Sequence, residues 1–464
     1  MPVPHAVRVL RAKFQSLNRA GFVRSVSVLV GGTAFAQAVT VLVLPLLTRL
    51  YTPFDFSLLA VFASILSIIS VVACLRLEIA IPLPESDEDA VNLLAAALCL
   101  SSAIAVLTGF VVWWFPTQIA DLVGQPALRP YLWLLPLGVW LASAYATVQF
   151  WSTRKKRFDA IAKTRMTQAI GGAGTQIGLG WAQFVPLGLI LGQVISSGAG
   201  LFGLGRDVLR KDRASLQEIS WSGMRRMLRK YDRFPKFSTF EAFANSASIQ
   251  LPVIIIAALS IGPEAGYLML AMRAMAAPMG LIGGAVSQVY LSRAPTELRA
   301  GRLGVFTSQI IGGLAKTGVG PLVFAGIISP VVFPLIFGNK WLRAGELVAW
   351  MTPWFVMQFL ASPVSMTLHV TDNQRAALNL QLFGLALRVG AVGAAGWWMP
   401  AHIVEVYAVS GFFFYCVYLY VVMVLSGIKL ADLHAVLRTG LRAALAWAAA
   451  GIALVMSAPA LRIV

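Results

Sequence analysis

The strongest constraint on this chain is that its apolar residues fall into about twelve separate segments, each close to the ~20 residues that a helix needs to cross a bilayer. The segments predict membrane-spanning helices at 26–48, 57–77, 91–115, 131–150, 166–184, 186–205, 238–260, 266–291, 306–336, 347–370, 376–398 and 403–426. Hydrophobic residues make up 58% of the sequence and charged residues 12%, about half the charged share of a soluble protein. The pattern predicts an all-α polytopic membrane protein.

The basic residues predict the orientation. Most of the 37 Lys and Arg residues fall in every second gap between the segments, including the N-terminal arm and the long gap Arg206–Lys236. The opposite gaps hold Arg49, Arg129, Lys340 and Arg343. Because cytoplasmic loops carry the Lys and Arg excess, we expect a cytoplasmic N-terminus. The net charge of +18 would suggest nucleic acid in a soluble protein, but these charges flank apolar segments, so we expect anionic lipid headgroups as partners and no nucleic acid.

The longest polar interval divides the spans six and six. It covers 206–237, is basic, and has apolar residues near helical spacing, which predicts a cytoplasmic linker helix between an N-terminal lobe (26–205) and a C-terminal lobe (238–426). Residues 1–25 combine apolar and basic positions at helical spacing, which predicts an amphipathic helix on the inner membrane surface. The C-terminal segment, 427–464, contains an alanine-rich run that is either an extra span or an interfacial helix.

A weak internal repeat relates the two lobes. The first span contains LPLLTRLYTPFDFS at Leu44–Ser57, and the seventh contains LPVIIIAALSIGPEAG at Leu251–Gly266. Each has Leu-Pro within the span, followed by a proline and an acidic residue in the outer turn before the next helix. Both copies run in the same direction, as expected for two six-helix lobes related by an axis along the membrane normal.

Charged residues inside the spans are candidates for a binding site, because a charge at the bilayer centre costs roughly 2.5–3.5 kcal/mol and usually faces a cavity or a partner. Four such residues are Glu241, Arg273, Lys316 and Arg388. Helical register places Arg273 level with about Val253 in the outer half of the membrane and Glu241 in the inner part, too far apart to pair. Lys316 and Arg388 fall near mid-membrane.

This excess of positive charge suits an anionic ligand such as a phosphate or a pyrophosphate. The alternative is that each cation makes a structural bond to a helix carbonyl or to an acid such as Glu264 or Glu405. Arg49 closes the first span on the outer side, where an interfacial arginine can also extend to water at little cost, so both interpretations apply to it.

Motifs for catalysis and metal binding carry little weight. Asp87-Glu88-Asp89 matches the D-x-D pattern of glycosyltransferases, but a helix dipole also favours acids at a helix N-terminus. The three cysteines lie in apolar segments and the four histidines are scattered, which predicts neither disulfides nor a zinc site. The sequence has no phosphate-binding loop and no Ser-His-Asp arrangement, so we expect no enzyme, no catalytic residue, no metal and no cofactor. Whether a coupling ion is used stays open.

Two stretches resemble a known family. LLTRLYTPFDFS, at Leu46–Ser57, resembles the end of the first helix of polysaccharide and O-antigen flippases, although Ser57 stands where the family often has glycine. RFPKFSTFEAFANSASIQLPVIIIAALSIGPEAGYLMLAMRAMAAPMGLIGGAVSQVYLSRA, at Arg233–Ala294, resembles their seventh and eighth helices. These are oligosaccharide flippases of the multidrug/oligosaccharidyl-lipid/polysaccharide exporter superfamily, and the likeness in helix number and layout covers nearly the whole chain.

The resemblance implies two six-helix lobes around a central cavity that opens alternately to each side of a bacterial inner membrane. It implies a polyprenyl-pyrophosphate-linked oligosaccharide as substrate, in lipopolysaccharide, capsule or exopolysaccharide synthesis, with a polysaccharide polymerase or other assembly machinery as an expected partner. It also implies a cavity lined by helices one, two, seven and eight, which carry Arg49, Asn245, Gln250, Arg273 and Gln288. Arg273 would hold the pyrophosphate, with Arg49 and Lys316 enlarging the positive field.

Two other functions are considered. A multidrug or cation exporter of the same superfamily would favour a cavity rich in Asp and Glu, which is the reverse of the predicted interior. A membrane glycosyltransferase or polymerase would typically carry a long extracytoplasmic loop, and every outer gap in this sequence is short.

Overall fold

The computed structural model describes residue 28, residues 30–428 and residues 430–457. Among these residues the chain forms helices joined by short turns, and none lies in a strand. Eleven helices in the described part of the chain are long and apolar enough to cross a membrane. The predicted all-α, multi-pass architecture is therefore confirmed. We call the end of the bundle that carries the turns at 51–52 and 260–263 the outer end, following the orientation predicted from the basic residues.

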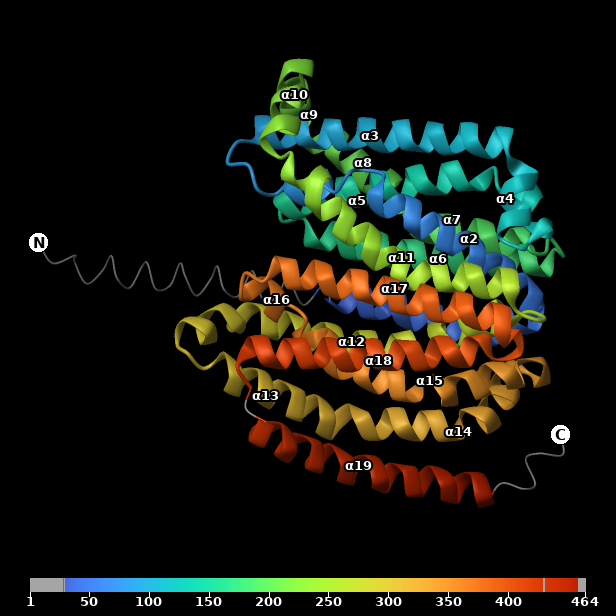
Figure 1. Ribbon diagram of the computed structural model, residues 1–464. Helices are drawn as coiled ribbons and strands as arrows, with labels where there is room; N and C mark the ends of the chain where they lie inside the picture. Colours follow the sequence, from blue (N-terminus) through green and yellow to red (C-terminus); the bar gives the residue numbers. More distant parts are fainter. Residues whose placement is uncertain (1–27, 29, 429, 458–464) are drawn as a thin grey trace, which may run out of the picture.

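The N-terminal lobe has its helices α3 to α8 in the upper part of Figure 1, with α3 at the edge. It consists of the helix Val30–Leu50, α2 (Pro53–Val72), α3 (Asp87–Trp114), α5 (Leu134–Arg154), α6 (Phe158–Trp181), and α7 (Leu187–Gly198) continued by α8 (Gly200–Lys211). Shorter elements are η1 (Leu77–Ala80), α4 (Pro116–Leu122) and η2 (Pro126–Tyr131). α3 packs along α5, and α6 packs along α7. Each predicted span of this lobe overlaps a helix, although α2 begins at Pro53 rather than at residue 57.

The C-terminal lobe lies in the lower part of Figure 1. It consists of α11 (Thr239–Leu259), α12 (Glu264–Arg299), α13 (Leu303–Leu314), α14 (Gly320–Phe337), α15 (Leu342–Ala361), α17 (Gln374–Trp398) and α18 (Ile403–Ser426). The π-helical turn η4 (Ala315–Val319) connects α13 to α14 within one span. Short elements are η5 (Asn339–Trp341), η6 (Ser362–Val364), α16 (Thr367–Val370) and η7 (Pro400–His402). α14 and α18 both pack on α15, and α17 packs on α11.

The C-terminal region adds a long helix, α19 (Leu430–Ser457), of which Gly440–Ser457 is one of the eleven candidate spans. α19 runs along α14 at the edge of the C-terminal lobe (Figure 1). Trp447 packs edge to face on Phe324, with 5.4 Å between ring centroids. Of the two alternatives for this region, the structure favours a helix that runs parallel to the spans.

The linker between the lobes is two short helices rather than the single helix predicted for 206–237. α9 (Arg213–Gln217) is followed by α10 (Trp221–Lys230), and the π-turn η3 (Phe234–Ser238) leads into α11. Ser220 separates the two helices because its backbone is extended and its hydroxyl caps α10. The Ser220 N–H also donates to Asn92 Oδ1 of α3 (2.9 Å), which holds the linker on the N-terminal lobe. The amphipathic helix predicted for 1–25 lies outside the described residues.

The turn between the first two helices is short because its residues form a helix cap. The Thr52 hydroxyl accepts from the Asp55 N–H (3.3 Å), and the Asp55 carboxylate accepts from the Thr52 N–H (2.8 Å). Pro53 takes the first helical position, where its missing N–H needs no partner. The TPFD part of the motif at Leu46–Ser57 is therefore a capping box that starts α2 directly after the preceding helix.

The two lobes meet at the outer end, where the two copies of the internal repeat contact each other. The Gly266 N–H donates to the Ser57 hydroxyl (2.8 Å). A Cβ atom on Gly266 would lie 1.9 Å from the Pro53 carbonyl oxygen, so only glycine fits at this position. The two segments that the internal repeat relates thus contact each other directly.

Trp341 extends this outer junction from the C-terminal lobe. Its side chain is fully buried, and its indole N–H donates to the Thr48 carbonyl (3.2 Å) in the helix Val30–Leu50. The ring meets Phe56 of α2 and Tyr267 of α12 edge to face, at centroid distances of 4.9 and 6.0 Å. Aromatic pairs of this kind add about 0.5–1.5 kcal/mol each beyond the burial of their area. Direct contact between the lobes therefore closes the outer end.

Replacing Gly266 by Ala is expected to separate the outer ends of the lobes, because the added methyl group overlaps the Pro53 carbonyl. Spin labels at Leu122 and Trp397, which are 83% and 85% exposed on opposite lobes, would report the separation by pulsed dipolar spectroscopy in a cysteine-free background. The matched control is Gly284→Ala on the same helix, where no atom lies within 4 Å of a Cβ. Equal label distances in the two variants would contradict the proposed junction.

At the inner end, Asp212 connects the linker to two helices of the N-terminal lobe. Arg157 donates two hydrogen bonds of 2.6 Å to the two Asp212 carboxylate oxygens, and the buried Trp151 indole donates a third (2.9 Å). Burial alone would raise the pKa of the Asp212 carboxyl, but the hydrogen bonds from Arg157 and Trp151 outweigh it and hold the pKa below its usual value. The interaction is therefore fully formed at neutral pH.

We expect Asp212→Asn to lower the free energy of unfolding by about 3 kcal/mol, because the substitution leaves the partly buried Arg157 guanidinium without its carboxylate partner. Since the native pKa of Asp212 is depressed, the contribution is present at neutral pH and is lost only as the pH falls below about 4. Thermal unfolding in detergent at pH 7 measures the difference. Asp207→Asn, which removes an exposed pair with Lys211, is the control and should change the midpoint little.

Candidate functional site

The strongest candidate site is a hollow of about 230 Å³ lined by helices of both lobes. Its polar lining consists of Gln37 and Thr40 of the helix Val30–Leu50, Gln176 of α6, Gln193 and Ser196 of α7, and Arg273 of α12. Arg273 is the one charged residue among those that line it. The hollow therefore presents a cation among neutral hydrogen-bonding groups, an arrangement that suits an anionic, hydroxyl-rich ligand.

Arg273 bridges the two lobes through a neutral acceptor. Its Nη2 donates to Gln193 Oε1 at 2.8 Å. Among the described residues, no carboxylate lies within ion-pair distance of Arg273, and its other N–H groups have no protein acceptor. A glutamine oxygen satisfies one donor but leaves the charge unbalanced, so this guanidinium is available to an anion.

Small residues bring α6 and α7 close together beside Arg273. A Cβ on Gly172 would lie 2.7 Å from the Ser196 Cβ, and one on Gly192 would lie 2.3 Å from the Gln176 side chain. This agrees with the expectation that small residues in spans permit close helix packing. The same packing positions Gln176, whose backbone carbonyl oxygen accepts a hydrogen bond from the buried Tyr51 hydroxyl (2.6 Å).

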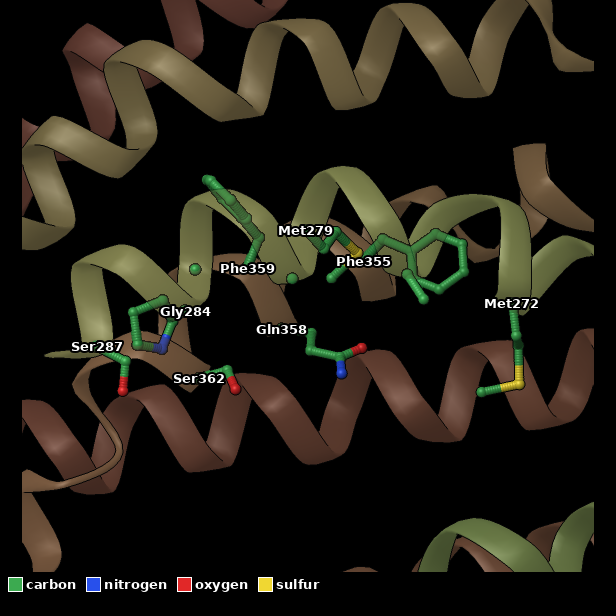
Figure 2. Close-up of a pocket in the computed structure, with 12 residues that line it drawn as sticks. Met272, Met279, Gly284, Ser287, Phe355, Gln358, Phe359 and Ser362 are labelled. Atoms are coloured by element: carbon green, nitrogen blue, oxygen red, sulfur yellow. The ribbon is translucent and has the colours of Figure 1, made fainter. Parts of the chain in front are cut away.

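A second hollow, of about 390 Å³, lies between α12 and α15. Figure 2 shows Gln358 near its middle, with Met272 toward one end and Ser287 and Ser362 toward the other. Phe355 and Phe359 complete a lining that is largely apolar. Met272 and Arg273 are consecutive, so α12 borders both hollows.

The acids at the outer end of the C-terminal lobe are bound to Arg343. Its guanidinium lies 3.1 Å from a Glu264 oxygen, 2.6 Å from Glu405 and 3.3 Å from Glu346. Glu264 and Glu405, the two acids considered as partners for deeper cations, are thus bound elsewhere. The cluster joins the first turns of α12, α15 and α18 and leaves Arg273 without a carboxylate.

Arg388, one of the predicted cavity cations, lies in the core of the C-terminal lobe. It is 1% exposed, and its guanidinium carbon lies 4.2 Å from the Phe414 ring centroid, 5.4 Å from Tyr415 and 5.5 Å from Trp354. The Nε and Nη2 groups have no hydrogen-bond acceptor among the described residues. Aromatic faces therefore hold this cation, and it lines neither hollow.

Arg49 and Lys316 also lie apart from Arg273. Arg49 is exposed near the outer end of its helix, which fits the interfacial alternative. Lys316 is exposed on the π-turn Ala315–Val319, which ends two residues before Pro321. Proline cannot donate to the preceding turn, which accounts for the irregular helix at this position. Neither residue lines either hollow.

The polar residues predicted on α11 and α12 have different surroundings. Gln250 connects the lobes, because its side-chain oxygen accepts from Ser64 of α2 (3.0 Å). Glu241 is half-buried in the first turn of α11, whereas Asn245 and Gln288 are exposed. Of the eight predicted residues, Arg273 alone lines the hollow between the lobes, with Gln250 in the neighbouring α2–α11 contact.

The acidic run at the start of α3 forms ion pairs. Asp87 accepts from Arg154 Nε (3.0 Å) and also binds Lys155. Arg226 of α10 binds both Glu88 (3.2 Å) and Asp89 (3.0 Å). These acids attach α3 to α5 and to the linker. Within the described ranges no group of three or more acidic, His or Cys side chains is arranged to hold a metal ion.

Sequence reasoning missed all five polar residues that line the hollow together with Arg273: Gln37, Thr40, Gln176, Gln193 and Ser196. All are neutral, and such residues are common in spans for packing alone, so charge could not single them out. One signal was present. The helix α6, which supplies Gln176 to the hollow and also carries Lys163, Arg165 and Gln168, is absent from the eleven apolar candidates.

We expect Arg388→Lys to lower the free energy of unfolding by about 1–2 kcal/mol, because an ammonium is more strongly hydrated and cannot spread over three rings. Thermal unfolding measures the change. Arg375→Lys, at an exposed position of the same helix, is the control and should unfold like the unmodified protein. A stable Arg388→Lys protein that had lost ligand binding would instead make Arg388 part of a site.

The comparisons with known proteins agree with this layout. Residues 46–346 match the family model described as "Polysaccharide biosynthesis protein". The fold is similar to "Lipid II flippase MurJ, inward closed conformation", with a TM-score of 0.71 and 13% identity over 92% of this chain and 91% of that chain. It is also similar to a Vibrio cholerae MATE transporter, VcmN, with a TM-score of 0.52 and 9% identity over 88% and 97% of the two chains.

No curated protein sequence matches this chain. At identities of 13% and 9% the structural likeness concerns the fold alone, which is the predicted arrangement of two lobes of spanning helices. The family match covers most of the chain, including both stretches on which the resemblance was based. The chain belongs to the polysaccharide biosynthesis protein family.

Proposed function

We propose that this protein is a flippase that moves polyprenyl-pyrophosphate-linked oligosaccharides across the bacterial inner membrane, for lipopolysaccharide, capsule or exopolysaccharide synthesis. The observation that carries the proposal is Arg273, a membrane-depth guanidinium between the lobes that has no carboxylate partner among the described residues. Family membership supports a role in polysaccharide synthesis, and the similar folds support transport.

The lining of the hollow suits both parts of such a head group. A pyrophosphate is a multidentate anion that binds a guanidinium through charge-assisted hydrogen bonds. Sugar hydroxyls both donate and accept, as do the amides and hydroxyls of Gln37, Thr40, Gln176 and Ser196. The polyprenyl tail would stay in lipid, because its transfer into a polar hollow is unfavourable.

The size of the hollow requires the lobes to move. Its volume of about 230 Å³ is below the ~300–1,000 Å³ of pockets that enclose a drug-sized ligand, so it cannot enclose an oligosaccharide. Loading from the inner side would separate the lobes and replace Gln193 on Arg273 by a phosphate. Release at the outer side would require the junction at Gly266 and Trp341 to open. These steps amount to alternating access.

A cationic-drug exporter is less well supported by the same hollow. A cavity for organic cations requires negative charge or exposed aromatic faces, and the lining contains one guanidinium and no carboxylate. A glycosyltransferase is not supported either, because the D-x-D acids are bound in ion pairs.

Reconstitution in liposomes tests the proposal directly. A fluorescent polyprenyl-pyrophosphate oligosaccharide is placed in the inner leaflet, and its exposure outside is followed over time. Arg273→Gln is expected to slow transport at least 10-fold, since one charge-assisted contact contributes about 1.5–3 kcal/mol. Arg273→Lys should retain part of the rate because it keeps the charge.

Two further variants test whether the loss of transport is specific to the charge of Arg273. Arg129→Gln removes the same charge from an exposed outer position and should leave transport unchanged. Gln193→Ala removes the neutral acceptor but keeps the cation, so transport should persist. Unchanged transport by Arg273→Gln would remove Arg273 from the mechanism. Resistance of cells to cationic dyes that depended on the gene, without transport of the lipid, would support the exporter instead.

A further inference from the structure

We infer that the N-terminal lobe holds an anionic bilayer phospholipid in a groove between α3, α5 and α8, with its phosphate on Arg206 and Arg210. The groove has a volume of about 570 Å³ and is separate from both hollows described above. Its walls are almost wholly apolar and include Leu94, Trp140 and Phe202. The two arginines are its only charged lining residues.

The arginines are placed for a headgroup. They lie four residues apart on α8, so they share one face of the helix, and both are exposed. α8 ends at Lys211, so the pair lies at the end of the lobe that carries α9 and α10. From Phe202 to Arg210 the helix rises roughly 12 Å, close to the ~15 Å thickness of one hydrocarbon leaflet. An acyl chain along the groove would therefore bring its phosphate to the arginines.

The acids of this region do not neutralise the pair. Asp207 binds Lys211 (3.0 Å), and Asp212 is bound by Arg157 and Trp151. Among the described residues, neither Arg206 nor Arg210 forms an ion pair, so two guanidinium groups remain for one phosphate-bearing headgroup. Basic pockets between spanning helices at the membrane surface are a recurrent site for anionic lipids.

The groove shares no lining residue with the Arg273 hollow proposed for the transport substrate. α3 forms the edge of the N-terminal lobe in Figure 1, and its main contacts are with other elements of the first half of the chain and the linker. The lining of the groove comes from the N-terminal lobe and the linker alone, whereas the Arg273 hollow is lined by helices of both lobes. The occupant is therefore a lipid of the bilayer itself. Because Leu216 of α9 also lines the groove, a bound lipid would attach the linker to the lobe.

Replacing Gly205 tests lipid binding in the groove while Arg206 and Arg210 stay in place. Gly205 lines the groove, and no atom lies within 4 Å of a Cβ built on it, so the side chain of Gly205→Leu has room to begin and would extend into the groove. Gly178→Leu, on an exposed face of α6 with equally open space, is the matched control. For the charges, the double variant Arg206→Gln/Arg210→Gln is compared with Arg213→Gln, which is exposed on α9 and does not line the groove.

The full-length protein is purified in detergent and titrated with phosphatidylglycerol, phosphatidylcholine or undecaprenyl phosphate, and bound lipid and the unfolding midpoint are measured by native mass spectrometry and thermal unfolding. We expect phosphatidylglycerol to bind at least 10-fold more tightly than phosphatidylcholine and to raise the midpoint. Gly205→Leu and the double variant should each lose this binding at least 10-fold, whereas both controls should keep it.

Three outcomes would overturn the inference. They are equal binding of phosphatidylglycerol and phosphatidylcholine, full phosphatidylglycerol binding by Gly205→Leu, and tighter binding of undecaprenyl phosphate at the same residues. None of these outcomes bears on transport through the Arg273 hollow, because the groove residues and the hollow residues do not overlap.

Discussion

Arg343 binds three carboxylates at the outer end of the C-terminal lobe, and two of them, Glu264 and Glu405, are therefore not partners of the deeper cations Arg273 and Arg388. In hydrocarbon an arginine needs an acid, an aromatic face, a neutral acceptor or a ligand. Arg343 has the acids and Arg388 has the aromatic faces. Arg273 has one amide oxygen from the opposite lobe, which satisfies a donor without balancing its charge. Arg388 is therefore a structural cation held by aromatic rings, whereas Arg273, which has no carboxylate partner among the described residues, is available to an anion.

The outer junction gives a physical meaning to the motif that first indicated the family. Thr52, Pro53 and Asp55 cap α2, and this places the Pro53 carbonyl against Gly266 of the opposite lobe. The second copy of the repeat supplies that glycine in its own outer turn. A segment that starts a helix within one lobe thus also forms the contact between the lobes. Changes in this segment are expected to affect both helix capping and the closure of the outer end.

The sequence was sufficient for the fold because membrane insertion leaves few alternatives. About twelve apolar runs of spanning length, with basic residues in alternate gaps, permit little besides a helical bundle. The site was only partly predictable. Arg273 stood out because a charge at membrane depth is costly, whereas Gln37 and Gln193 gave no such signal. Arg388 met the same criterion as Arg273, and only the structure shows that it packs on Phe414 and other rings. The position of a residue along a spanning helix predicts its depth in the membrane. It does not predict which face of the helix packs against a neighbouring helix.

In the proposed transport cycle, the neutral acceptor on Arg273 also bears on how the ligand would be released. A carboxylate in the position of Gln193 would hold the guanidinium in an ion pair that an incoming phosphate would have to displace, and transport would stall with the lobes closed. An amide oxygen makes a weaker bond, so a phosphate can replace it and the amide can replace the phosphate after release. Because Gln193 and Arg273 lie on different lobes, such an exchange would also remove one contact between the lobes. A glutamine at position 193 is therefore better suited than a glutamate to the proposed binding and release of an anion at Arg273.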